Sequence, residues 1–319
     1  MAKIVSIVGA TGAQGRGVIA AFANDPAYRV RAITRNPQSA ASRALAAQPG
    51  IAEVVQADLD DVESLKAAFA GSAIIFGVTN FFEPFAAHGP ERAVEVEARQ
   101  GINLATAAAS ALSTLEHYIW STLPDGKAVS AGKYVVPHFE AKNRADAFIR
   151  RNEALLRRTT FLWVTWYHSN YVSPMFKPYW IPTAEKHVQF ASYAPGTPVT
   201  TIGDVSVNLA QFVRAIVTQG NTAGGAIVLA AIETSTAENL LHRWAKAKGT
   251  KAQFVQVDGK TYRDLWPRWA EEMGVMMEYW DEYREKSWTA ANGQKVLTKD
   301  DLNISGMQSL DEAYKGLEL

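Results

Sequence analysis

The sequence contains no cysteine and carries no net charge. Without cysteine, the 319-residue chain forms no disulfide, binds no metal through thiolates and has no thiol nucleophile. Its 32 basic and 32 acidic residues cancel, so the chain as a whole has no attraction for phosphate backbones or anionic lipid. No basic patch stands out, and we therefore expect no nucleic-acid partner.

Long apolar runs are also missing. The longest, at about 226–232, is far below the roughly 20 residues that cross a bilayer. The apolar stretch at 3–8 is too short for the core of a signal peptide. We therefore expect a cytoplasmic protein without membrane association. Neither an H-E-x-x-H pair nor a G-x-S-x-G elbow is present, so a metal site and serine-hydrolase chemistry are not expected.

Short β-branched runs alternate with longer amphipathic segments in the first half of the chain. Strands are predicted near 3–8, 28–34, 51–57, 73–78, 117–121 and 160–164. Helices are predicted near 13–24, 37–47, 61–70, 91–111 and 137–153. This alternation is the pattern of βαβ units with right-handed crossovers. It predicts an α/β fold with a Rossmann-type, doubly wound parallel sheet.

The alternation breaks after Val164, where five prolines fall between residues 174 and 198. Mostly loop or edge structure is expected there. The alternation returns with predicted helices near 203–218 and 235–247 and strands near 226–230 and 252–257. We predict a nucleotide-binding domain over 1–160, which segments at about 200–230 rejoin. Residues 161–199 and 231–319 are predicted to form a smaller, discontinuous α+β substrate lobe.

The first predicted strand runs directly into a glycine-rich turn. Gly9, Gly12 and Gly15 have G-x-x-G-x-x-G spacing and open an amphipathic helix. Glycine is needed where backbone N–H groups approach a pyrophosphate at a helix N-terminus, because a side chain would block the approach. Since the motif follows a strand and precedes a helix, it predicts a dinucleotide site.

The end of the second predicted strand decides which dinucleotide fits. An acidic residue about 20 positions after the glycines would hold the ribose 2′-hydroxyl of NAD. Arg35 stands at that distance. A guanidinium favours a 2′-phosphate, so NADPH/NADP is the predicted cofactor. The alternative is that Arg35 is a solvated surface charge.

Several short motifs, in a fixed order, resemble those of the NmrA-like family, the atypical short-chain dehydrogenases. The resemblance rests on the glycine turn with Gln14, and on 34–37, 55–61, 76–80, 120–122, 138–142, 166–170 and 203–205. It implies a Rossmann fold that binds NAD(P).

The resemblance also implies a role for each matching residue. Those that would bind the pyrophosphate are Gly9, Thr11, Gly12, Ala13, Gln14 and Gly15. Arg35 would bind the 2′-phosphate, and Asp58 with Leu59 the adenine. At the nicotinamide end, the implied residues are Thr79, Asn80, Lys142, Tyr167 and Asn170, with Lys142 on the ribose hydroxyls. The alternatives are a helix cap for Asp58 and a strand-ending turn for 79–80.

The Tyr-x-x-x-Lys pair of classical short-chain dehydrogenases reads His138-x-x-x-Lys142 in this sequence. Helical spacing of four places both side chains on one face, and an imidazole can donate a proton near neutral pH. The catalytic candidates are therefore His138, Lys142 and Tyr167. The alternative is that His138 only packs or hydrogen-bonds at the helix start after Pro137.

The segment 161–193 holds ten aromatic residues in 33. Such a segment would make a wall for a flat, apolar ligand beside the nicotinamide, with core packing as the alternative. The predicted substrate-binding residues are Trp166, His168, Tyr171, Met175, Phe176, Tyr179 and Trp180. A second aromatic cluster at 266–288 would close the lobe or a subunit contact, so an oligomer is left open.

Two functions from different classes follow from these predictions. The first is an NADPH-dependent reductase that delivers a hydride to a C=O, C=N or activated C=C bond of a medium-sized apolar or aromatic molecule, such as a secondary metabolite. The second is a noncatalytic NADP(H)-binding redox sensor that regulates a protein partner. A third possibility is a non-redox cyclisation or condensation. The missing tyrosine favours the sensor, and the aromatic segment favours the enzyme.

Overall fold

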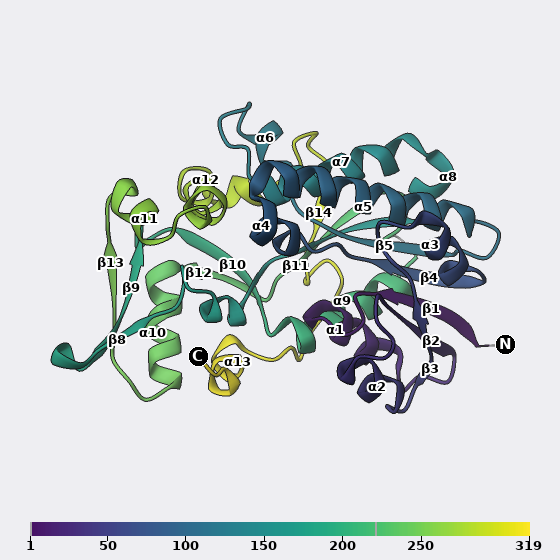
Figure 1. The fold of residues 1–319 in the computed structure, drawn as a ribbon, viewed down its shortest axis with the longest axis horizontal. Coiled ribbons are helices and arrows are strands. Elements are labelled where there is room, and N and C mark those ends of the chain that lie inside the picture. Colours follow the sequence, from purple (N-terminus) through teal and green to yellow (C-terminus); the bar gives the residue numbers. More distant parts are fainter. Residues whose placement is uncertain (1, 221) are drawn as a thin grey trace.

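The computed structural model describes residues 2–220 and 222–319. Its largest unit is an eight-stranded sheet with helices on both faces (Figure 1). All neighbouring strands in this sheet are parallel, in the order β14-β11-β6-β5-β4-β1-β2-β3. The predicted α/β fold with a doubly wound parallel sheet is therefore confirmed.

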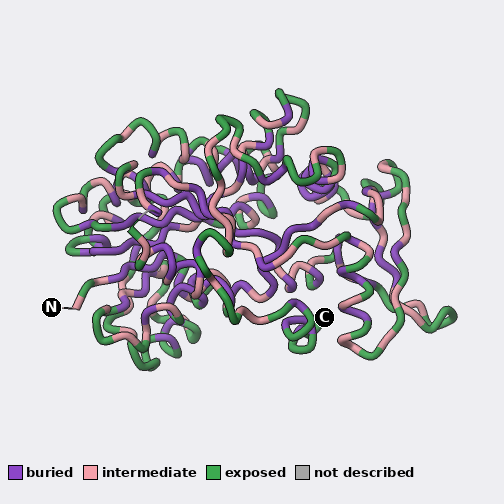
Figure 2. The backbone as a smooth tube through the Cα atoms, turned by 180° about the vertical axis from the view of Figure 1, so that it is seen from behind, coloured by how far each residue is buried: buried purple, intermediate pink, exposed green. Residues whose placement is uncertain are grey.

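The strands of the large sheet are short and mostly buried, which explains their apolar, β-branched sequences. They are β1 (Lys3–Val8), β2 (Tyr28–Thr34), β3 (Ile51–Gln56), β4 (Ser72–Gly77), β5 (His117–Thr122), β6 (Thr159–Val164), β11 (Ala226–Ala230) and β14 (Val296–Leu297). Figure 2 shows buried backbone concentrated in this part of the molecule. The first six strands and β11 coincide with the predicted ones to within one or two residues.

Helices cover the two faces of the sheet in separate groups (Figure 1). One face carries α3 (Val62–Phe69), α5 (Pro90–Ser110), α7 (Pro137–Arg151) and α8 (Glu153–Leu156), and the other carries α1 (Ala13–Phe22), α2 (Ala40–Ala46) and α9 (Val205–Thr218). Gly17 of α1 permits a close approach of α9, because a Cβ there would lie 2.6 Å from the carbonyl oxygen of Val205. The helix α9 and the strand β11 thus belong to the large sheet and its cover, whereas β10 (Pro198–Gly203), which overlaps the start of the predicted return at about 200–230, lies in a small sheet.

The remaining strands form two three-stranded sheets. One contains β7 (Trp166–Tyr167), β10 (Pro198–Gly203) and β12 (Glu233–Thr236); the other contains β8 (Tyr179–Ile181), β9 (Lys186–Ala191) and β13 (Ala252–Gln256). The helices of this region are α10 (Ala237–Ala247), α11 (Gly259–Leu265), α12 (Val275–Tyr283) and α13 (Leu310–Gly316), while α4 (Phe82–His88) and α6 (Gly126–Val129) follow β4 and β5.

Two features of the smaller region differ from expectation. Loop or edge structure was expected around β9, but this strand is central in its sheet. It can pair on both sides because Pro182 and Pro195 lie outside its ends. The two-residue strand β14 adds to the edge of the large sheet rather than to the small sheets. Among residues 2–220 and 222–319, no helix is both long and apolar enough to cross a membrane.

Candidate functional site

A cavity of about 1000 Å³ opens at the carboxyl ends of the large sheet's strands. The strand order reverses between β1 and β4, and ligands of doubly wound sheets bind at such a switch point. All fourteen residues that the resemblance assigned to a cofactor line this cavity: Gly9, Thr11, Gly12, Ala13, Gln14, Gly15, Arg35, Asp58, Leu59, Thr79, Asn80, Lys142, Tyr167 and Asn170. His138 lines it as well.

The glycine turn has the geometry that a bound pyrophosphate needs. Gly9 has a φ of +64°, and a Cβ on Gly15 would lie 2.2 Å from the carbonyl oxygen of Gly9. Gly12 precedes α1 without a side-chain cap, and the first turn of the helix carries no acidic residue. The N–H groups at this helix end are therefore free for an anionic group. The turn fits a dinucleotide cofactor.

The other end of the nucleotide wall carries an ion pair. Arg35, just after β2, donates hydrogen bonds of 2.6 and 2.9 Å to the carboxylate of Glu83 in α4. The hydrogen bond from Arg35 to Glu83 raises the pKa of the guanidinium above its ordinary value. Both side chains line the cavity. Glu83 was not predicted as a site residue, because nothing in its local sequence indicates that α4 folds over the end of β2.

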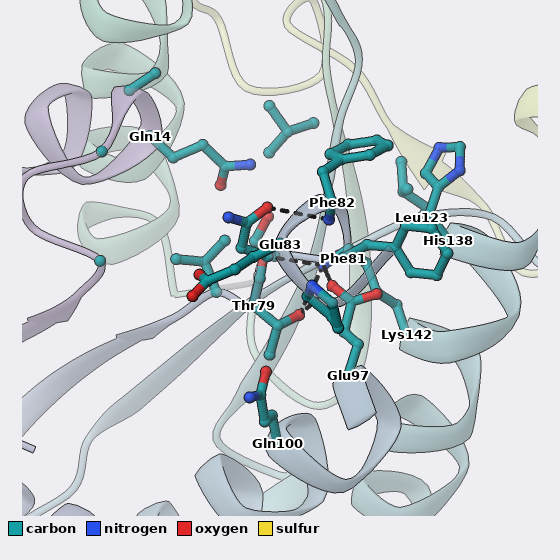
Figure 3. A pocket seen from close by; sticks show the side chains of 18 of the residues that line it. Gln14, Thr79, Phe81, Phe82, Glu83, Glu97, Gln100, Leu123, His138 and Lys142 are labelled. Atoms are coloured by element: carbon teal, nitrogen blue, oxygen red, sulfur yellow. Dashed lines mark hydrogen bonds and ion pairs between the residues drawn. The ribbon is translucent and has the colours of Figure 1, made fainter. Parts of the chain in front are cut away.

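Deeper in the cavity, three polar side chains form a closed network (Figure 3). The Lys142 ammonium group lies 2.8 Å from Thr79 Oγ1 and 2.8 Å from Glu97 Oε1. Thr79 in turn donates a 2.6 Å hydrogen bond to the same oxygen of Glu97. Glu97 of α5 is only 1% exposed, so the lysine charge is neutralised inside the protein. A carboxylate was not expected at this place.

A second basic side chain of the cavity is also paired with a buried carboxylate. The Nδ1 atom of His138 is hydrogen-bonded to Glu272, which lies in a π-helical turn at Ala270–Gly274. The imidazole ring packs against Phe81, Phe82 and Phe139, with ring centroids 5.9, 5.7 and 4.7 Å away. His138 therefore packs and hydrogen-bonds at the start of α7, and it lines the cavity together with Lys142.

Tyr167 of β7 is hydrogen-bonded to the glycine turn. Its hydroxyl accepts a 2.7 Å hydrogen bond from the amide of Gln14 in the glycine turn. Burial raises the pKa of Tyr167 to about 12, so the phenol stays protonated near neutral pH. The hydroxyl hydrogen remains free to donate, because Gln14 supplies the proton of the bond between them.

The predicted substrate residues divide into two groups. Trp166 and Phe176 line the cavity, with ring centroids 4.5 Å apart. The other five lie elsewhere: His168 bonds to the Gly203 carbonyl, Tyr171 stacks on Tyr314, Met175 is in the core, and Tyr179 and Trp180 are exposed on the edge strand β8. The density of aromatic residues in a segment does not reveal which rings face a cavity and which face the core.

The rest of the aromatic wall comes from segments not assigned to the substrate. Phe82 of α4 stacks with Trp269, at a centroid distance of 5.9 Å, and both line the cavity. From the C-terminal cluster at 266–288, the structure adds Met273, Met276, Trp280 and Trp288. The sequence suggested that this cluster closes the lobe or a subunit contact, and the structure places part of it in the wall of the cavity. No group of three His, Asp or Glu side chains in the described segments is arranged to hold a metal ion.

The family model of the NmrA-like family matches residues 1–315. The chain belongs to the NmrA-like family. The resemblance seen in the short motifs is thereby confirmed along nearly the whole chain. Among curated relatives, the NmrA-like family domain-containing oxidoreductase hkm9 of Aspergillus hancockii is 29% identical over 266 residues, which cover 80% of this chain and 76% of that protein.

Solved structures show the same fold at low sequence identity. NmrA, a negative transcriptional regulator, aligns with a TM-score of 0.77 and 20% identity over 99% of this chain and 96% of its own. That regulator has been solved in complex with NAD and with NADP. The triphenylmethane reductase of Citrobacter sp., solved with NADP(H), aligns with a TM-score of 0.68 and 18% identity over 98% of both chains.

Proposed function

We propose that this NmrA-like protein is an NADPH-dependent reductase of a medium-sized apolar or aromatic molecule, possessing a C=O, C=N or activated C=C bond. The observation that carries the proposal is the continuity of one cavity. The glycine turn, the buried pair of Lys142 and Glu97, the imidazole of His138 and an aromatic wall all line it. The oxidoreductase name of hkm9 supports the same class of reaction.

The nucleotide half of the cavity fits NADPH. The open N-terminus of α1 and the glycines would receive the pyrophosphate, and Arg35 would bind the 2′-phosphate after leaving Glu83. Asp58 and Leu59 would flank the adenine, while Thr79, Asn80 and Asn170 would lie beside the nicotinamide ribose. Bound there, the cofactor supplies a hydride.

The protein's own groups prepare the site for that hydride. Lys142 is fixed by Thr79 and Glu97, so its ammonium group can hydrogen-bond ribose hydroxyls without moving. The aromatic side chains Trp166, Phe176 and Trp280 exclude water and offer flat surfaces to the acceptor. Protonation of the reduced atom requires a donor, for which His138, Tyr167 and Lys142 are the candidates within the cavity.

The experiment that tests this function has two stages. Calorimetric titration with NADPH, NADP and NADH is expected to show binding, with preference for the phosphorylated forms. NADPH oxidation at 340 nm is then followed with 4-nitrobenzaldehyde, 1,4-naphthoquinone and the cationic triphenylmethane dye crystal violet. The last of these is chosen because a relative of this fold is a triphenylmethane reductase. Absence of nucleotide binding would contradict the proposal.

A second candidate function is a noncatalytic redox sensor. It is favoured by the absence of the catalytic tyrosine and by the carboxylates that engage both Lys142 and His138. The named role of NmrA as a negative transcriptional regulator supports it. Such a protein would bind NADPH and NADP with different affinities, turn over none of the three acceptors, and bind its protein partner differently in the two nucleotide states.

A further inference from the structure

His138 and Glu272 are 134 residues apart in the chain and meet in the interior. Glu272 has no exposed side-chain surface, and His138 is 7% exposed. The carboxylate makes two contacts through Oε1, one with the imidazole Nδ1 and one with the backbone N–H of His138, at 3.4 Å. Its other oxygen is buried without a partner among the described residues. Burying a carboxylate away from water costs free energy, and the interaction with its partner must offset that cost.

The local structure holds Glu272 against the start of α7. His138 is the second residue of that helix, so its backbone N–H has no partner within the helix. The positive end of the helix dipole also favours an anion there. On the other side, the π-helical turn at Ala270–Gly274 turns Glu272 inward, and such turns are frequent at functional sites.

The pairing also decides which ring nitrogen faces the ligand. With Nδ1 occupied by Glu272, Nε2 is the nitrogen left to meet a molecule in the cavity. Figure 3 shows His138 on the side of the cavity where Phe82 and Leu123 lie. The other charged groups facing this region are Lys142, one turn further along α7, and Glu97 of α5, which neutralise each other. The imidazole and its carboxylate therefore form a separate acid–base unit.

We propose that His138 is the proton donor of the reductase, and that Glu272 is the positioning residue that holds the ring with Nε2–H toward the substrate. This inference rests on the function proposed above and extends it to one substrate class: neutral acceptors, such as aldehydes or imines, whose reduced atom must gain a proton. Cationic acceptors need no such donor.

The acceptor carbon gains the hydride, and the C=O or C=N π electrons move onto the heteroatom. That atom takes the proton from Nε2 of the imidazolium, so the N–H bond breaks and an O–H or N–H bond forms. The neutral ring keeps its Nδ1–H bond to Glu272, and Nε2 regains a proton from water. NADPH is oxidised to NADP, and the acceptor is reduced to an alcohol or amine.

The other two candidates are less suited to this step. Burial keeps the pKa of Tyr167 at about 12, which makes its phenol a weak acid near neutral pH. Lys142 already donates to Glu97 and Thr79, so transfer of its proton would leave Glu97 without its counter-ion.

The test compares a neutral with a cationic acceptor. Hydride transfer converts 4-nitrobenzaldehyde to an alcohol only with a proton, whereas crystal violet becomes its neutral leuco form by hydride addition alone. The variants are His138→Asn and Glu272→Gln. Glutamine is chosen at position 272 because it keeps an oxygen that can accept from the backbone N–H of His138 and loses only the charge. Glu271→Gln, the exposed neighbour in the same turn, is the matched control.

We expect the ratio of aldehyde to dye turnover to fall about 100-fold in His138→Asn, which is at the lower end of the range typical of a lost general acid. In Glu272→Gln the ring remains and loses only its charged partner, so the ratio should fall less, by about 10-fold. The ratio should stay unchanged in Glu271→Gln. As a readout independent of turnover, ¹⁵N-histidine NMR of the nucleotide-free protein should show Nδ1 of His138 protonated. Its resonance should shift in Glu272→Gln and not in Glu271→Gln.

Several results would overturn the inference. Equal loss with both acceptors would assign the pair a structural role, and an unchanged ratio in His138→Asn would remove the ring as donor. An Nδ1 atom of His138 without a proton would contradict the proposed hydrogen bond to Glu272, and this readout holds even if the protein reduces only one of the two acceptors. A wild-type protein that binds NADPH but reduces neither acceptor would instead contradict the proposed function, and the donor role with it.

Discussion

Arg35 and Glu83 form a two-point ion pair across one end of the cavity, with Nη1 to Oε1 at 2.6 Å and Nη2 to Oε2 at 2.9 Å. The two side chains are 62% and 51% exposed, so the pair itself adds little to stability. Its consequence lies in ligand binding. A 2′-phosphate that binds Arg35 as proposed would have to take the guanidinium from Glu83, and the carboxylate left beside it would repel the phosphate.

Glu83→Gln should therefore strengthen the binding of NADPH. The amide releases Arg35 more easily and carries no charge, so we expect the Kd of NADPH to fall about fivefold, which corresponds to about 1 kcal/mol. The Kd of NADH should change less than twofold, because NADH has no 2′-phosphate. Calorimetry measures both. Glu91→Gln, at the exposed start of α5, is the control, and parallel gains for both nucleotides would contradict the repulsion.

Arg35→Ala tests the other half of the ion pair. Loss of the guanidinium removes the charge-assisted hydrogen bonds to a 2′-phosphate, so NADPH affinity should drop at least about tenfold more than NADH affinity. The ratio of the two dissociation constants is the quantity to follow. If both nucleotides lose affinity equally, Arg35 does not bind the 2′-phosphate and is a surface charge held by Glu83.

In the buried network around Lys142, removing one charge of the ion pair should destabilise the protein more than removing both. Glu97→Gln leaves the ammonium group buried without a counter-ion, and we expect a loss of about 3–5 kcal/mol in the free energy of unfolding. The double variant Glu97→Leu with Lys142→Met removes both charges and should recover most of that loss. NADPH binding should not recover, since the lysine is absent. Urea unfolding and calorimetry separate the two effects, and a double variant that binds NADPH normally would exclude Lys142 from the site.

Short sequence patterns predicted those parts of the structure that are determined by residues close together in the chain. The strands β1 to β6 coincide with apolar runs because both faces of a parallel sheet are covered by helices. The glycine turn was recognisable because its residues are also close in the sequence. Gly9 and Gly15, which contact each other, are six residues apart. β14 was not recognisable, because two residues at a sheet edge carry no periodicity.

The partners of the site residues depend on tertiary structure and were not predicted. Glu272 reaches His138 from a segment 134 residues later, and no spacing rule connects them. Glu97 did leave a signal: it occupies the same helical face as Ala93 and Gly101, four residues before and after it, both of which are buried. A charge within such an apolar stripe indicates a buried partner. The cytoplasmic location stays a prediction from the sequence.

The pH dependence of stability should reveal another buried group, His117 at the start of β5. Its Nε2 lies 2.6 Å from the Thr160 hydroxyl, which in turn donates to the carbonyl of Thr222. The imidazole is therefore the donor to Thr160, and burial lowers its pKa from 6.5 to about 4. Below pH 6.5 the unfolded chain gains a proton that the folded chain does not, so stability is lost as the pH falls from 6.5 toward 4.

Replacing His117 by glutamine isolates this effect. The glutamine amide can still donate to Thr160, and it does not titrate. At pH 5 the wild-type protein should have lost up to about 2 kcal/mol through His117, relative to pH 7, since each pH unit corresponds to about 1.4 kcal/mol. His117→Gln should be spared that loss, and His88→Gln, at an exposed position, should not. Urea unfolding at the two pH values measures the difference. If all three proteins lose the same stability on acidification, the pKa of His117 is not lowered in the folded protein, and burial does not oppose its protonation.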